Sequence, residues 1–119
     1  MADYKEIETG EAYKIWKARR NEIIVLDVRR DDEFYGETGH IENAVHIPIE
    51  ELDSRVNELD KHKEIYVICY AGTRSAQACQ ILAERGFTKL FNIIGGMMEW
   101  SDNNFEVVDK NLWPNVPKR

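Results

Sequence analysis

Two periods of hydrophobic and polar positions run along the chain. Residues 23–28 and 65–68 form nearly continuous apolar runs, which are typical of strands buried on both faces of a parallel sheet. Residues 11–20 and 75–85 instead place their apolar side chains at helical spacing. The alternation of the two patterns predicts an α/β fold, a doubly wound parallel β-sheet flanked by helices.

The pattern also predicts shorter elements between these segments. We expect strands at residues 4–7, 44–47 and 90–94, a helix at 50–59, one helical turn at 97–101 and a polar loop at 29–40. Pro48 separates a strand from a helix, and Gly86 ends the helix at 75–85. Residues 109–119 are predicted to form an extended tail that packs through Trp113, within one domain spanning residues 1–119.

Composition and charge narrow the class of protein. An apolar share of 43% and a charged share of 32% describe a small, well-solvated globular protein rather than a disordered chain. The net charge of −6, which no cluster of lysine and arginine with interleaved aromatic residues offsets, argues against nucleic acid as a partner. The first residues lack the features of a signal peptide, and no run reaches the length of a membrane span. We therefore expect a cytoplasmic protein without a membrane partner.

One thiol stands where a predicted strand turns into a predicted helix. Cys69 follows the apolar run at 65–68 and opens the sequence Cys-Tyr-Ala-Gly-Thr-Arg-Ser, which leads into the helix at 75–85. Such a turn aims backbone N–H groups at one point, and the N-terminus of a helix favours negative charge. Both effects stabilise a thiolate over a thiol, so Cys69 is the candidate nucleophile.

Spacing within this turn separates two chemistries. Four residues lie between Cys69 and Arg74, whereas a phosphatase cradle of the related type has five. With one residue fewer, the turn forms a tighter ring around the thiol, and this ring better suits a single extra sulfur atom than a tetrahedral oxyanion. Gly72 permits the positive φ that lets neighbouring amides converge. Arg74 either binds an anion at the thiol or pairs with a surface carboxylate, and Ser75 serves equally well as a helix cap or as an anion donor.

Several segments in the same order resemble the rhodanese family of sulfurtransferases, over roughly residues 7–108. The resemblance rests on the Cys69 turn and on further segments in order, which are Leu26-Asp27-Val28-Arg29, Glu33-Phe34, Gly39-His40-Ile41, Ala44-Val45-His46-Ile47-Pro48, Gly86-Phe87, and Gly95-Gly96 followed by Trp100. Asn43 stands where family members commonly carry glycine, and asparagine tolerates the positive φ that this position then needs.

The resemblance implies sulfur transfer through a persulfide on Cys69. The sulfane sulfur would come from thiosulfate or a persulfide and pass to cyanide or a thiol, with a sulfur-relay protein as a further candidate partner. The resemblance implies no metal and no cofactor, because backbone amides would stabilise the negative charge of the persulfide. The loop and anion-binding residues would be Tyr70, Ala71, Gly72, Thr73, Arg74 and Ser75. Only Arg74 among them is positive, so thiosulfate is one candidate donor and not a required one.

Other polar residues are assigned supporting or structural roles. Asp27 and Arg29 end a strand near the same edge of the sheet, where Asp27 would hold loop amides or Arg74 and where Arg29 would pair with Glu33. Cys79 lies within the predicted helix and is expected to pack in the core, with a role as a resolving thiol as the alternative. The three histidines show no zinc-binding spacing with the cysteines.

The sequence leaves two other functions open. A phosphatase or arsenate reductase of rhodanese-like fold would use the same thiolate on an oxyanion, although the spacing to Arg74 counts against it. A non-catalytic interaction module would keep the fold but would usually lose the nucleophile. Cys69 is present here together with Gly72 and Arg74, which favours the enzyme.

Overall fold

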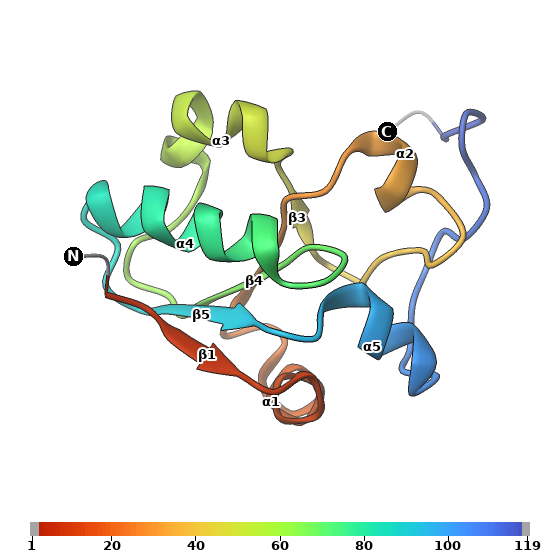
Figure 1. Ribbon diagram of the computed structural model, residues 1–119, viewed down its shortest axis with the longest axis horizontal. Coiled ribbons are helices and arrows are strands. Elements are labelled where there is room, and N and C mark those ends of the chain that lie inside the picture. Colours follow the sequence, from red (N-terminus) through yellow and green to blue (C-terminus); the bar gives the residue numbers. More distant parts are fainter. Residues whose placement is uncertain (1–2, 118–119) are drawn as a thin grey trace.

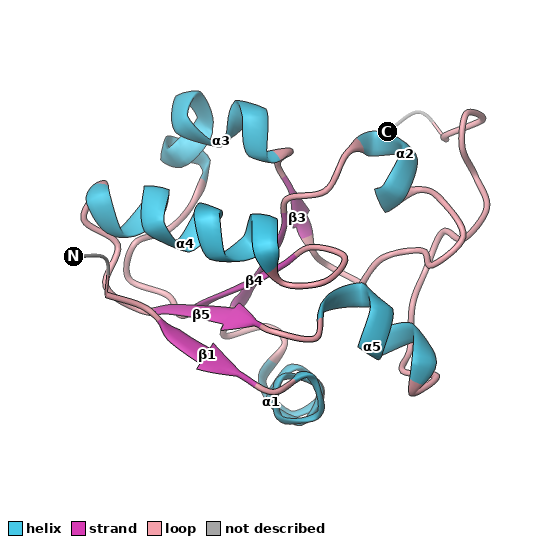
Figure 2. Cartoon of the chain, viewed as in Figure 1, coloured by secondary structure: helices cyan, strands magenta, loops and turns pink. Residues whose placement is uncertain are grey.

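The computed structural model describes residues 3–117, which contain a five-stranded sheet (Figures 1 and 2). Its strands, in the spatial order β1-β5-β4-β2-β3, are all parallel to their neighbours. They are β1 (Lys5–Ile7), β2 (Ile24–Asp27), β3 (Val45–His46), β4 (Ile65–Ile68) and β5 (Leu90–Ile93). The two longest apolar runs of the sequence therefore form the adjacent strands β2 and β4 at the centre of the sheet.

Helices cover both faces of this sheet. They are α1 (Thr9–Arg19), α2 (Asp31–Phe34), α3 (Ile49–Arg55), continued by a 3-10 turn (Val56–Glu58), α4 (Thr73–Glu84) and α5 (Gly96–Asp102). Helices α3 and α4 pack together on one face, and α1 and α5 pack together on the other (Figure 1). The doubly wound parallel fold is thus confirmed. None of the helices in residues 3–117 has the length and apolar character needed to cross a bilayer.

Strand β4 supplies side chains to two separate hydrophobic clusters. Val67 points to the cluster under α3 and α4, which includes Leu82, whereas Ile68 points to the cluster under α1 and α5, which includes Trp16. All four of these side chains are almost completely buried. Because successive side chains of a strand face opposite sides of the sheet, burial on both sides explains why residues 65–68 are apolar without interruption.

Several element boundaries differ from the sequence prediction. Residues 29–40 are not wholly a loop, because they contain α2, whose first turn carries Asp31, Asp32 and Glu33. Acidic side chains stabilise the N-terminus of a helix, and the Glu33 carboxylate accepts a hydrogen bond from the Arg30 backbone N–H at 3.1 Å. The predicted helix at 50–59 ends its α-helical part at residue 55, and α4 begins at residue 73 rather than 75.

Two loop predictions have different outcomes. Asn43 has a φ of 68°, so the positive φ expected at this position is confirmed. Trp113, through which the tail was predicted to pack, is 49% exposed, and the last two residues of the predicted tail lie outside the described residues. Backbone hydrogen bonds hold this segment, since the N–H groups of Leu112 and Trp113 both donate to the carbonyl of Tyr35.

Candidate active site

Cys69 lies at the point where the sheet changes its direction of winding. It follows β4 directly, and the neighbouring strand β2 ends at Asp27, which is in register with Ile68. From β2 the chain continues outward to β3, while from β4 it continues to β5 on the other side. In open parallel sheets, ligands bind beyond the carboxyl ends of the strands at such a switch point.

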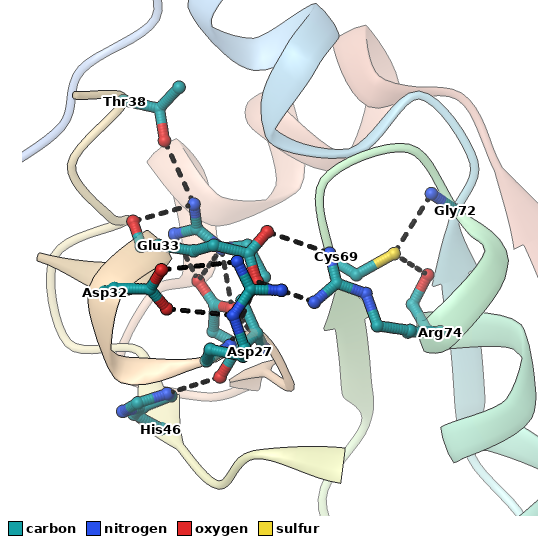
Figure 3. A network of polar contacts seen from close by, with 11 residues as sticks. Asp27, Asp32, Glu33, Thr38, His46, Cys69, Gly72 and Arg74 are labelled. Carbon is teal, nitrogen blue, oxygen red and sulfur yellow. Dashed lines mark hydrogen bonds and ion pairs between the residues drawn. The ribbon is translucent and has the colours of Figure 1, made fainter. Parts of the chain in front are cut away.

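The chain from Cys69 to Ser75, here called the Cys69 loop, turns its N–H groups inward. The carbonyl oxygens of Cys69 and Tyr70 accept hydrogen bonds from the backbone N–H groups of Met97 and Met98 in α5, at 2.9 and 3.0 Å. Because these carbonyls face α5, the amides that follow face the thiol. The N–H of Gly72 donates to Cys69 Sγ at 3.1 Å (Figure 3). The loop thus directs backbone N–H groups at the sulfur, an arrangement that favours negative charge there.

Two glycines allow this close packing. Gly72 has a φ of 98°, and a Cβ atom on it would lie 2.5 Å from the carbonyl oxygen of Ile94. Gly96 has a φ of 60°, and a Cβ atom there would collide with the Tyr70 carbonyl. Both positions combine a left-handed backbone with contact against other backbone atoms, so a larger residue would displace the loop. The positive φ predicted for Gly72 is confirmed.

Opposing effects set the pKa of Cys69. Its side chain is almost completely buried, and burial raises the pKa because it disfavours the thiolate. The Ser75 hydroxyl and the backbone N–H groups of Ser75, Gly72 and Ala71 oppose this effect and together outweigh it. The pKa of Cys69 therefore lies below its usual value, as the sequence predicted for a thiol at a helix N-terminus.

Ser75 contacts the thiol directly and also binds a residue that the sequence analysis missed. Its Oγ lies 3.3 Å from Cys69 Sγ and 2.5 Å from Asn92 Oδ1, in β5. Asn92 Nδ2 in turn donates to the Gly72 carbonyl at 3.2 Å. An asparagine in the middle of an apolar strand was the available signal, because a buried amide needs partners.

The charge of Arg74 is compensated by an ion pair with Glu33. Its guanidinium forms two parallel hydrogen bonds with the Glu33 carboxylate, Nη1 to Oε1 at 2.6 Å and Nη2 to Oε2 at 2.9 Å (Figure 3). The guanidinium lowers the pKa of Glu33, which keeps the carboxylate ionised at neutral pH. The pair ties α2 to the Cys69 loop and compensates the charge of Arg74.

The sequence prediction paired the wrong partners. Asp27 does not hold Arg74, and Arg29 does not pair with the Glu33 carboxylate. Instead, Arg29 binds Asp27, with Nη2 to Oδ2 at 2.8 Å and Nε to Oδ1 at 2.9 Å. Both side chains are buried, and the guanidinium also donates to Thr38 Oγ1 and to the Gly39 carbonyl. This pair fixes the segment that carries Glu33 against the end of β2.

The outer side of the Cys69 loop borders an open cavity of about 320 Å³. Residues that line it include Arg29, Asp32, Glu33, Thr38 and Tyr70. Tyr70 is 42% exposed and lies at the edge of this cavity. Phe34 of α2 is buried and stacks between the rings of His40 and His46.

Cys79 occupies the core, as predicted. Its side chain projects from α4 into the hydrophobic cluster and is fully buried, and burial raises the pKa of its thiol to about 12. Cys79→Ala is therefore expected to retain nearly all activity and to lower the free energy of unfolding by about 1 kcal/mol, the cost of a small cavity. Steady-state kinetics and urea denaturation test this expectation. A large loss of activity in a folded variant would instead favour a resolving thiol.

The structure is thus a parallel α/β sheet flanked by helices, with a buried cysteine of lowered pKa directly after its central strand. The chain belongs to the rhodanese family, because the model of the rhodanese-like domain matches residues 11–103.

Named relatives and solved structures agree with this family assignment. The chain is 37% identical over 97 residues to the thiosulfate sulfurtransferase GlpE of Coxiella burnetii, covering 82% of this chain and 87% of that protein. It is 40% identical over 91 residues to YrkF of Bacillus subtilis, covering 76% of this chain but only 48% of that protein. A rhodanese-related protein of Thermoplasma volcanium superimposes with a TM-score of 0.79 at 33% identity, over 89% of this chain and 99% of that one. The chain is thus similar to members of a sulfurtransferase family.

Proposed function

We propose that this protein transfers a sulfane sulfur through a persulfide on Cys69. The Cys69 thiolate attacks the outer sulfur of a donor, forms an S–S bond and breaks the donor's own bond to that sulfur. With thiosulfate as donor, sulfite leaves with the electron pair. A thiolate or cyanide then attacks the outer sulfur of the persulfide, and the Cys69 thiolate is released. No net oxidation occurs, and no metal or cofactor takes part.

The cradle around the sulfur supports this proposal most strongly. The Gly72 N–H lies 3.1 Å from Sγ, and the Cys69 loop lowers the pKa of the thiol despite its burial. A thiolate is the form that attacks a sulfane sulfur. The same inward N–H groups can stabilise negative charge on the outer sulfur of the persulfide, as an oxyanion hole stabilises developing charge. Thiosulfate is a candidate donor because the relative GlpE is named for it.

Intact-protein mass spectrometry tests the intermediate. Brief incubation with thiosulfate is expected to add about 32 Da, one sulfur atom, and cyanide is expected to remove it. A protein without an adduct would next be offered a persulfide donor and then an aryl phosphate. Turnover of the phosphate without any sulfur adduct would contradict the proposal and favour the phosphatase. Failure with all three substrates would favour a non-catalytic module.

The Arg74 and Glu33 pair predicts how the site discriminates between charged and neutral reagents. Because Glu33 compensates the guanidinium, Glu33→Gln removes the carboxylate that binds Arg74, whose charge interacts electrostatically with Cys69. We expect this variant to raise kcat/KM for thiosulfate about fivefold, the effect of about 1 kcal/mol between partly exposed charges. Arg74→Ala should lower the rate with anionic donors more than with neutral ones.

Alkylation of Cys69 by iodoacetate and by iodoacetamide makes this comparison without a sulfur donor. Both alkylate a thiolate in the same way, but only iodoacetate is charged, so the ratio of their rates reports the local potential and not the thiolate fraction. The ratio should rise in Glu33→Gln and fall in Arg74→Ala. If the ratio does not change in either variant, the pair has only a structural role.

A further inference from the structure

The hydroxyl of Ser75 has one hydrogen and two neighbouring acceptors. Its Oγ lies 2.5 Å from Asn92 Oδ1 and 3.3 Å from Cys69 Sγ, and all three side chains are buried (Figure 3 shows the thiol within its loop). Asn92 cannot simply turn its amide around, because Nδ2 donates to the Gly72 carbonyl at 3.2 Å. The Asn92 oxygen is therefore held toward Ser75 as a fixed acceptor.

The charge of the sulfur decides where this hydrogen points. With a neutral thiol, the S–H group donates to Ser75 Oγ, and the hydroxyl donates to Asn92 Oδ1, so each donor has an acceptor. With a thiolate, the sulfur has lost its hydrogen and needs donors. The strongest one that is free to turn is the Ser75 hydroxyl, since the N–H of Gly72 is already fixed.

We propose that Asn92 is a positioning residue that holds the Ser75 hydrogen while Cys69 is uncharged and releases it to the sulfur when the thiolate forms. The hydroxyl rotates about its Cβ–Oγ bond, and its O–H bond stays intact. If the proposed sulfur transfer takes place, the persulfide places its charge on the outer sulfur, and the hydrogen returns to Asn92. This last step rests on the proposed function, whereas the first does not.

The charges that face the thiol stay the same in the experiment that follows. Arg74 of α4 and Glu33 of α2 form one ion pair, and Asp27 and Arg29 at the end of β2 form another. From α5, the residues whose amides bind the loop carbonyls are the uncharged Met97 and Met98. Variants of Ser75 and Asn92 that carry no charge therefore change hydrogen bonding and leave these charges in place.

A double-mutant cycle separates the hydrogen switch from a general structural role. The measured quantity is the rate of Cys69 alkylation by iodoacetamide across a range of pH, followed by mass spectrometry. Ser75→Ala removes a donor from the thiolate and should slow alkylation at pH 7 about tenfold. Asn92→Leu removes the competing acceptor and should speed it about threefold, with the midpoint of the pH profile moved to lower pH.

The decisive comparison is Asn92→Leu in the Ser75→Ala background. Without the Ser75 hydroxyl, Asn92 Oδ1 and the thiolate no longer compete for one hydrogen, so Asn92→Leu should no longer speed alkylation. An equal change in both backgrounds, or slower alkylation in Asn92→Leu alone, would overturn the proposal and leave Asn92 as a support for the Gly72 carbonyl. Thermal unfolding of each variant verifies that it is folded.

A measurement on the unaltered protein keeps the proposal testable if these variants fail to fold. The NMR chemical shifts of the Asn92 side-chain amide should change with the same midpoint as the Cys69 alkylation profile. They should stop changing in Cys69→Ser. An Asn92 amide that does not respond to pH would overturn the switch. Because neither experiment uses a sulfur donor, a failure of the proposed function would leave both results unaffected.

Discussion

Cys69→Ser is expected to reduce sulfur transfer by at least about 10⁴-fold, because removing the nucleophile of a covalent mechanism removes the intermediate itself. A serine hydroxyl remains protonated where the Cys69 loop stabilises a thiolate, and it cannot form a persulfide. The cradle cannot substitute for the sulfur, since its N–H groups stabilise charge but form no bond. Thiocyanate formation from thiosulfate and cyanide measures the loss.

The same variant should remain folded, so that the loss can be assigned to chemistry. A serine oxygen can accept the Gly72 N–H and contact the Ser75 hydroxyl in place of Sγ, and we therefore expect a melting temperature within a few degrees of the parent. Cys79→Ala is the matched control, because it also removes a buried thiol but lies away from the loop. Retained turnover in Cys69→Ser would exclude Cys69 as the nucleophile.

The Cys69 loop could be predicted because its features are local. An apolar strand, a cysteine, a glycine and the start of a helix follow one another within a few residues, and each has a conformational meaning of its own. The alternation of strands and helices likewise predicts a parallel sheet, which places Cys69 at its carboxyl edge. Local sequence thus accounts for the position of the thiol and for the backbone N–H groups that surround it.

The polar network around the loop could not be predicted in the same way. Arg74 and Glu33 are 41 residues apart, and Ser75 and Asn92 are 17 apart, so their pairing depends on the order of the strands and on α2. The sequence contains several acidic candidates for each arginine, and spacing along the chain does not choose between them. The prediction consequently exchanged the partners of Arg29 and Arg74.

Two adjacent arginines offer a comparison between a buried and an exposed ion pair. Arg29 is almost completely buried and binds Asp27, which is also buried, whereas the side chain of Arg30 is 61% exposed and pairs with Asp32 at the surface. Removing one partner of a buried pair leaves the other charge without compensation in a medium of low dielectric constant. Exposed pairs contribute little, because water solvates both charges well.

We therefore expect Arg29→Ala to lower the free energy of unfolding by about 3–5 kcal/mol, a large part of the 5–15 kcal/mol typical of a domain. Arg30→Ala should change it little. Urea denaturation measures both values, and equal losses would show that burial does not determine the contribution of these pairs. Arg29→Lys should rescue only part of the loss, because one ammonium cannot reproduce the bonds to Asp27, Thr38 and Gly39.

The loss of Arg29 should also change the reactivity of Cys69. Its guanidinium donates to the carbonyl of Glu33 at 3.2 Å, so it fixes the helix whose carboxylate compensates Arg74. In the folded fraction of Arg29→Lys, the ratio of iodoacetate to iodoacetamide alkylation should shift toward that of Glu33→Gln. A variant that is destabilised but keeps the ratio of the parent would show that the buried pair maintains the fold without positioning the charges of the site.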